Sequence, residues 1–178
     1  MFERLSNKLK KAINFYNQEN YKESLRLYNK IIDLSSEIGF YEYKASALVG
    51  IAEVYKKLDD ENKVFENYLA AYEIFQAIKE IRGYRLSSAN IVEIYKRQGR
   101  YQEILEIYLQ DLDFYQDLEN EIETIKALNN IGETYQKLGD IEKAIAFYNQ
   151  ALSLCQELEN QELKFKIVKN LESTKRLS

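Results

Sequence analysis

Residues 128–152 read LNNIGETYQKLGDIEKAIAFYNQAL, and their spacing predicts two helices joined by a short turn. Leu128, Ile131 and Tyr135 recur at helical spacing, so a helix places them on one face. The Leu-Gly-Asp sequence at 138–140 then marks a turn. The second helix carries its own apolar series: Ile141, Ala144, Ile145, Tyr148, Ala151 and Leu152.

Aromatic residues recur along the chain with a step of 40 positions. One series is Phe15, Tyr55, Tyr95 and Tyr135, and a second is Tyr28, Tyr68, Tyr108 and Tyr148. Two interleaved series with one period indicate an internal repeat, in which each unit packs mainly on its neighbours. The predicted repeats cover about 1–40, 41–80, 81–120 and 121–160, within a single domain of residues 1–178.

The residues of the fourth repeat resemble the tetratricopeptide repeat pattern, with Leu128 in the place of the usual tryptophan. The usual period is about 34 residues, and the longer one here is similar to that of kinesin-light-chain-like and LGN-like arrays. HEAT and armadillo repeats lack this spacing of Gly, Tyr, Ala and aromatic residues. The resemblance implies an all-α fold, a right-handed α-solenoid of four helix-turn-helix repeats plus a C-terminal capping helix at about 161–176.

The same spacing predicts where the helices lie. The expected pairs are 3–18 with 21–37, 42–58 with 61–78, 82–98 with 101–118, and 121–138 with 141–158. Gly39, Gly83, Asn120 and Asn160 lie at expected helix ends, where a left-handed cap suits glycine and asparagine.

Composition narrows the function. The chain has 178 residues, 46% hydrophobic and 30% charged, with a net charge of −4 and no block of basic residues, so we expect a folded protein without affinity for nucleic acid. Histidine is absent and Cys155 is the one cysteine, so we expect no metal, no cofactor and no enzyme activity. No apolar run opens the chain, so we expect no membrane insertion and a cytoplasmic location, with a plastid stroma or other reducing interior left open.

The resemblance implies that the first helix of each repeat lines a concave groove. Three columns of residues are expected to project into it: Gly50, Asn90, Asn130 and Asn170; Glu53, Glu93 and Glu133; and Lys57, Arg97 and Lys137. Tyr16 is the aromatic residue expected on the same side of the first repeat. These residues form the expected partner-binding site.

Two interpretations of the columns stay open. Each asparagine amide offers a donor and an acceptor that suit the backbone of an extended peptide, or it caps and bridges neighbouring helices. The glutamate and basic columns stand four residues apart, so they form local ion pairs in the favourable orientation or recognise charges on a partner.

The resulting hypothesis is a non-catalytic interaction module that binds a peptide or partner helix in the groove. Two alternatives are an assembly factor or chaperone-like scaffold for a multi-subunit complex, such as a photosystem, and a peptide-sensing regulator. A homodimer is also open, through end-to-end stacking at a first repeat in which Phe2 and Leu5 are expected to be exposed.

Overall fold

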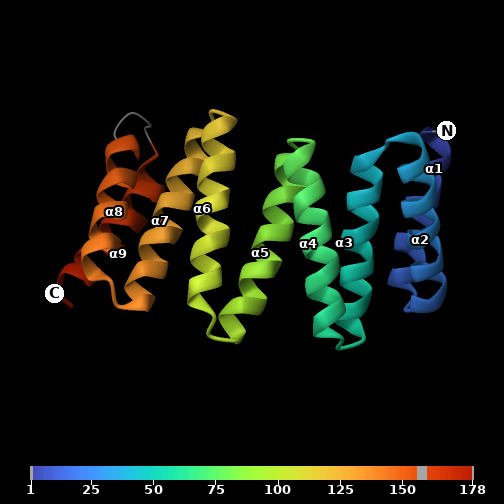
Figure 1. The fold of residues 1–178 in the computed structure, drawn as a ribbon, viewed down its shortest axis with the longest axis horizontal. Helices are drawn as coiled ribbons and strands as arrows, with labels where there is room; N and C mark the ends of the chain where they lie inside the picture. The colour runs from blue at the N-terminus through green and yellow to red at the C-terminus, as the bar shows by residue number, and fades with distance from the viewer. Residues whose placement is uncertain (1, 156–159, 178) are drawn as a thin grey trace. The chain divides into compact units, whose positions relative to one another are not determined.

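The computed structural model describes residues 2–155 and 160–177, and over these ranges the chain forms nine helices and no strand (Figure 1). The helices are α1 Phe2–Asn17, α2 Tyr21–Ile38, α3 Tyr41–Lys57, α4 Glu61–Ala77, α5 Ile81–Arg97, α6 Tyr101–Asp117, α7 Glu121–Leu138, α8 Ile141–Cys155 and α9 Gln161–Lys175. The predicted all-α class is confirmed. No helix in these ranges combines the length and apolar character that a membrane span requires.

The chain divides into two compact units, Met1–Ile94 and Tyr95–Ser178, which we call the N-terminal and C-terminal units. In each unit, consecutive helices run antiparallel and pack side by side (Figure 1). The single domain of residues 1–178, with its four repeat boundaries, stays a prediction.

The helix ends agree with the sequence prediction to within one residue, except where the chain is not described. The predicted end of the eighth helix, at 156–158, lies outside the described residues. These boundaries could be predicted because the apolar spacing is regular along each helix. The chain also has no proline, so no helix is interrupted by a missing backbone hydrogen bond.

The seven turns from α1 to α8 share one backbone conformation. A left-handed residue recurs every 20 positions: Glu19, Gly39, Asp59, Lys79, Gly99, Glu119 and Gly139. The residue that follows each of them precedes the next helix, and five of these residues cap it with a side-chain oxygen: Asn20, Asp60, Glu80, Asn120 and Asp140. Asn160 caps α9 in the same way. Each 40-residue repeat is therefore built from two halves of equal length.

Three of the four predicted left-handed caps are wrong. Asn120 and Asn160 have negative φ and act as N-caps, with their side-chain oxygens accepting from Glu123 N at 3.2 Å and Leu163 N at 3.0 Å. Gly83 lies inside α5, where an added Cβ would stand 2.3 Å from Phe75 Cζ. This glycine is needed because an aromatic ring lies directly on the backbone, not because the chain turns there.

The core of the N-terminal unit begins at the first turn of α1. Leu5 is fully buried and belongs to one hydrophobic cluster with Leu27, Tyr28 and Ile31 of α2, so the expectation that it is exposed is wrong. Phe2 is exposed, with its ring edge-on to Tyr43 at 5.5 Å between centroids. Among the described residues at the start of α1, the exposed apolar surface is therefore the Phe2 ring, without the Leu5 side chain that we expected beside it.

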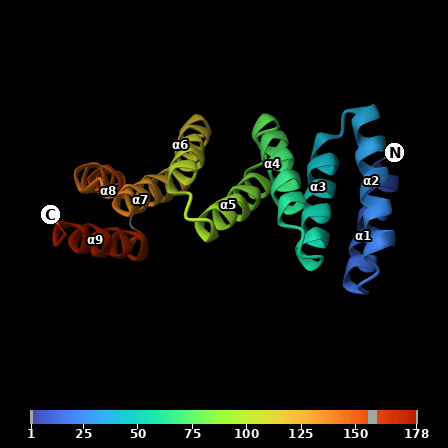
Figure 2. The same ribbon diagram turned by 60° about the horizontal axis from the view of Figure 1, so that its bottom comes forward.

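The core of the C-terminal unit is closed by α9, which packs along α7 and α8 (Figure 2). Leu163, Ile167 and Leu171 of α9 are buried there, whereas Phe165 on the opposite side is exposed. This division of apolar and lysine-bearing faces is what a capping helix requires.

Candidate functional site

Asn90 bridges α3 and α5 in the N-terminal unit. Its amide nitrogen donates to the Leu86 carbonyl of its own helix at 2.9 Å, and its amide oxygen accepts from Lys56 Nζ at 2.9 Å. Both ends of the amide are therefore occupied by the protein. At this position the structure matches the interpretation in which asparagine ties neighbouring helices together.

Glu53, half-buried on α3, accepts a hydrogen bond from the hydroxyl of Tyr68 on α4. The Lys56 ammonium stands 3.8 Å from the same carboxylate oxygen. Burial raises the pKa of the Tyr68 hydroxyl, and its hydrogen bond to Glu53 and the Glu53 charge raise it further. The Glu53 carboxylate thus accepts the hydrogen bond of the fully buried Tyr68 phenol, while the rest of the Glu53 side chain remains open to solvent.

Tyr16 is half-buried at the end of α1, with its ring 6.1 Å from that of Tyr21. Burial raises the pKa of Tyr28 and Tyr68, and in each case the Tyr16 phenol adds a smaller contribution. Tyr16 packs against the hydrophobic cluster that contains Tyr28. Gly50, the first member of the asparagine column, lies under the Tyr28 ring, where an added Cβ would meet Tyr28 Cζ at 2.3 Å.

The C-terminal unit holds a denser polar cluster, built by Asn129 and Glu133 of α7 and Asn170 of α9. Asn170 Nδ2 donates to Asn129 Oδ1 at 2.9 Å and to Glu133 Oε1 at 2.7 Å. Asn129 Nδ2 also donates to Glu133 Oε1 at 2.7 Å, and Lys166 Nζ lies 3.5 Å from that oxygen. Asn129 is only 1% exposed, so this cluster fixes α9 on α7.

Asn130 differs from the other two asparagines of its column. It is half-buried, and no hydrogen bond to another described residue uses its side-chain amide. It lines a pocket of 540 Å³ between α7 and α9, together with Lys126, Asn129 and Lys166. It also lines a pocket of 220 Å³ on the other side of α7, where Glu133 and Lys137 are neighbours.

The remaining predicted residues are exposed: Lys57, Glu93, Arg97 and Lys137. Among the described residues no ion pair joins Glu53 to Lys57 or Glu133 to Lys137, so the local-pair interpretation does not hold in these two repeats. Glu53 lies beside Lys56, the residue before Lys57, and Glu133 lies beside Lys166 of α9. Glu53 instead accepts from buried Tyr68 of α4, and Glu133 accepts from Asn129 of its own helix and Asn170 of α9. Lys57 and Lys137 are exposed.

Three residues that contact the predicted ones were missed by the sequence reading: Lys56 in the N-terminal unit, and Asn129 and Lys166 in the C-terminal unit. The column spacing selects one position per repeat, and these residues stand outside the columns. Asn129 had a local signal, since a polar residue beside Leu128 falls on the buried side of α7 and must find partners there.

The chemistry available to the candidate residues of each unit is hydrogen bonding and charge pairing. Among residues 2–155 and 160–177, no group of three or more His, Cys, Asp or Glu side chains is placed to hold a metal ion. Fixed carboxylates, amides and ammonium groups beside two pockets suit the recognition of a polar chain.

Residues 84–157 match the tetratricopeptide repeat family. A search of curated proteins gave no match. The fold is similar to a kinesin light chain repeat array of Podosopora anserina, at 13% identity and a TM-score of 0.64, over 97% of this chain and 86% of the other.

Two further solved structures share the fold. One is a signal transduction ATPase with a tetratricopeptide repeat sensor from Pyrococcus horikoshii, at 18% identity and a TM-score of 0.68, over 97% of this chain and 27% of that protein. The other is a Rap protein complexed with Competence and Sporulation Factor, at 18% identity and a TM-score of 0.54, over 94% of this chain and 47% of that protein. The chain therefore shares the helical-repeat fold of a kinesin light chain array, and its residues 84–157 match the tetratricopeptide repeat family.

Proposed function

We propose that this protein is a non-catalytic interaction module that binds a peptide or a partner helix on its α7–α9 face. We define this face by the pocket between the two helices and the residues Asn129, Asn130, Glu133 and Asn170. The observation that carries the proposal is the Asn130 amide, which lines two pockets and makes no hydrogen bond to the described residues.

The arrangement is preorganised for binding. Asn129, Glu133 and Asn170 hold one another in place, so a ligand that reaches Asn130 meets a surface already ordered. Binding then costs little side-chain ordering on the protein's part. An amide can accept from and donate to one peptide unit at once, which recognises a backbone without regard to its side chains.

The charges beside Asn130 would add selectivity. Lys126 and Lys166 border the larger pocket together with Glu162, whereas Glu133 and Lys137 border the smaller one. Their exposed groups affect the rate and specificity of association more than its affinity. Glu53, Glu93, Lys57 and Arg97 are proposed to contribute charge to partner binding elsewhere on the chain, and Tyr16 to contribute an aromatic contact. The Asn90 amide is already bonded to Lys56 and Leu86, so Asn90 is left out of this proposal.

A peptide-sensing role is a second candidate. It is favoured by the fold shared with the Pyrococcus horikoshii sensor and with the Rap protein in its complex with Competence and Sporulation Factor. An assembly factor for a multi-subunit complex is the third proposal, and no contact among the described residues favours it over peptide capture.

A peptide library displayed on phage tests the proposal. Peptides selected on the wild type are measured against Asn130→Ala, with Asn149→Ala as the matched control, since Asn149 is an exposed asparagine on α8. Loss of the paired hydrogen bonds should weaken binding about tenfold in Asn130→Ala, and the control should bind like the wild type. Equal binding by all three proteins, or no selection of any peptide, would remove the α7–α9 face as the site.

A further inference from the structure

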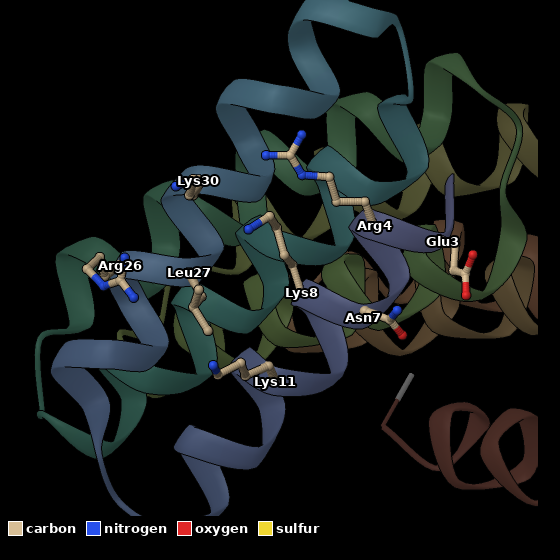
Figure 3. Close-up of a pocket in the computed structure, with 8 residues that line it drawn as sticks. All are labelled: Glu3, Arg4, Asn7, Lys8, Lys11, Arg26, Leu27 and Lys30. Atoms are coloured by element: carbon tan, nitrogen blue, oxygen red, sulfur yellow. The ribbon is translucent and has the colours of Figure 1, made fainter. Parts of the chain in front are cut away.

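A concentrated basic pocket lies between α1 and α2 of the N-terminal unit, outside the α7–α9 face. Five cationic side chains line its 630 Å³, namely Arg4, Lys8, Lys11, Arg26 and Lys30. Leu27 and Asn7 complete the lining, and Glu3 is the one acidic member (Figure 3). The net charge of the whole chain is −4, so this concentration of positive charge runs against the overall balance.

The cations of this pocket repel one another. Lys8 stands at the centre, and its pKa is lowered by partial burial and then by the charges of Lys30, Arg4, Arg26 and Lys11. Arg26 is the member with a carboxylate partner, since its Nε donates to Glu23 Oε2 at 2.8 Å. Folding therefore gathers like charges that the unfolded chain keeps apart, and an anion in the pocket would offset that cost.

We propose that this pocket binds a short acidic segment of a partner protein, one that presents several carboxylates together. Lysine ammonium groups on flexible stems can each turn toward a different carboxylate, whereas Leu27 offers a small apolar floor. The site is independent of the α7–α9 face, so either can fail without the other.

The charge of the described helices argues against a second copy of this chain as the occupant. Helix α9, which closes the other end of the repeat series, carries Lys164, Lys166, Lys169 and Lys175 against two glutamates. Two basic surfaces repel, so end-to-end stacking of α9 on this pocket is unfavourable.

Nucleic acid fits less well than an acidic peptide. No aromatic side chain lines the pocket, so bases would have no stacking surface. The basic residues come from successive turns of two adjacent helices, α1 and α2, as Figure 3 shows, which suits several carboxylates presented together on a short segment.

Fluorescence anisotropy with a labelled peptide of alternating glutamate and glycine tests the proposal directly. The matched peptide has glutamine for glutamate. The test variant is Lys8→Gln/Lys30→Gln, and the control is Lys63→Gln/Lys143→Gln, which loses the same charge from lysines paired with Asp60 and Asp140.

The acidic peptide should bind the wild type and the control alike. It should bind the test variant about tenfold more weakly at low salt, since each unit charge near an anion contributes several-fold. Equal loss in both variants would show a general charge effect and overturn the proposal. Tighter binding of single-stranded DNA or of phosphatidylserine vesicles than of the peptide would also overturn it.

Thermal unfolding of Lys8→Gln without ligand gives a second, independent readout. Removal of the central cation should raise the Tm at low salt, because it relieves repulsion from four neighbours. Added glutamate peptide should then raise the Tm of the wild type more than that of the variant. A lower Tm for Lys8→Gln would mean that the cluster is already compensated within the fold, and the proposal would be wrong.

Discussion

Replacing Asn170 and Asn130 by alanine should separate a structural asparagine from a binding one. Asn170→Ala removes the donor to Asn129 Oδ1 at 2.9 Å and to Glu133 Oε1 at 2.7 Å. Asn129 is 1% exposed, so water cannot replace the lost donor there, at a cost of about 1–3 kcal/mol. The Glu133 side chain is 42% exposed and still accepts the hydrogen bond from the Asn129 amide. Losing the Asn170 donor at Glu133 therefore costs little stability.

The better helix propensity of alanine returns about 0.5 kcal/mol in either variant. The net destabilisation of Asn170→Ala is therefore about 1–2 kcal/mol. Asn130→Ala breaks no hydrogen bond with the described residues, so its unfolding free energy should stay within about 0.5 kcal/mol of the wild type.

Urea unfolding followed by circular dichroism measures both values. An unchanged m-value in each variant is the condition for comparing them as changes in stability. Equal stability of the two variants, or a larger loss in Asn130→Ala, would refute the division of the column into tied and available amides.

Three further predictions concern stability. Gly132→Ala places a Cβ 2.7 Å from Cε1 of the buried Tyr148. After the gain in helix propensity, the unfolding free energy in urea should fall by about 1–2 kcal/mol. An unchanged midpoint would show that the Tyr148 ring can move. Glu119→Gly relieves a left-handed φ of 51° and should add about 0.5–1 kcal/mol, whereas a loss would mean that the side chain is needed. Burial and the Glu133 charge raise the pKa of Tyr148 to about 12 from 10.0, so its contribution is complete below pH 10 and is lost as the pH rises through 12. Between pH 10 and pH 12, Tyr148→Phe should therefore lose less unfolding free energy than the wild type. Parallel curves of unfolding free energy against pH for the two proteins would contradict this.

The fold could be predicted closely from the sequence because the same pattern of residues occurs in each of several repeats. Apolar spacing, the absence of proline and the aromatic series at 40-residue steps all point to helix pairs. The turn chemistry was harder to predict. Left-handed φ values occur at Glu19, Asp59, Lys79 and Glu119, and the glutamates and the lysine adopt this conformation against their intrinsic preference.

The candidate site was only partly predictable for a different reason. Column spacing shows which residues share a face, but not which side chains are already occupied. Asn90, Asn130 and Asn170 look alike in the sequence, yet Lys56 and Asn129 tie up two of them. The basic pocket gave no signal in the chain as a run of charge, because its members come from separate turns of α1 and α2.

Site-specific photocrosslinking tests the proposed binding face most directly. A benzophenone amino acid replaces Asn130 on α7 in one variant and Asn149 on α8 in the other, and both are irradiated in the cell that makes the protein. Binding on the α7–α9 face predicts a discrete crosslinked partner from position 130 and none from position 149. A partner captured from position 149 alone, or equally from both, would contradict binding on that face.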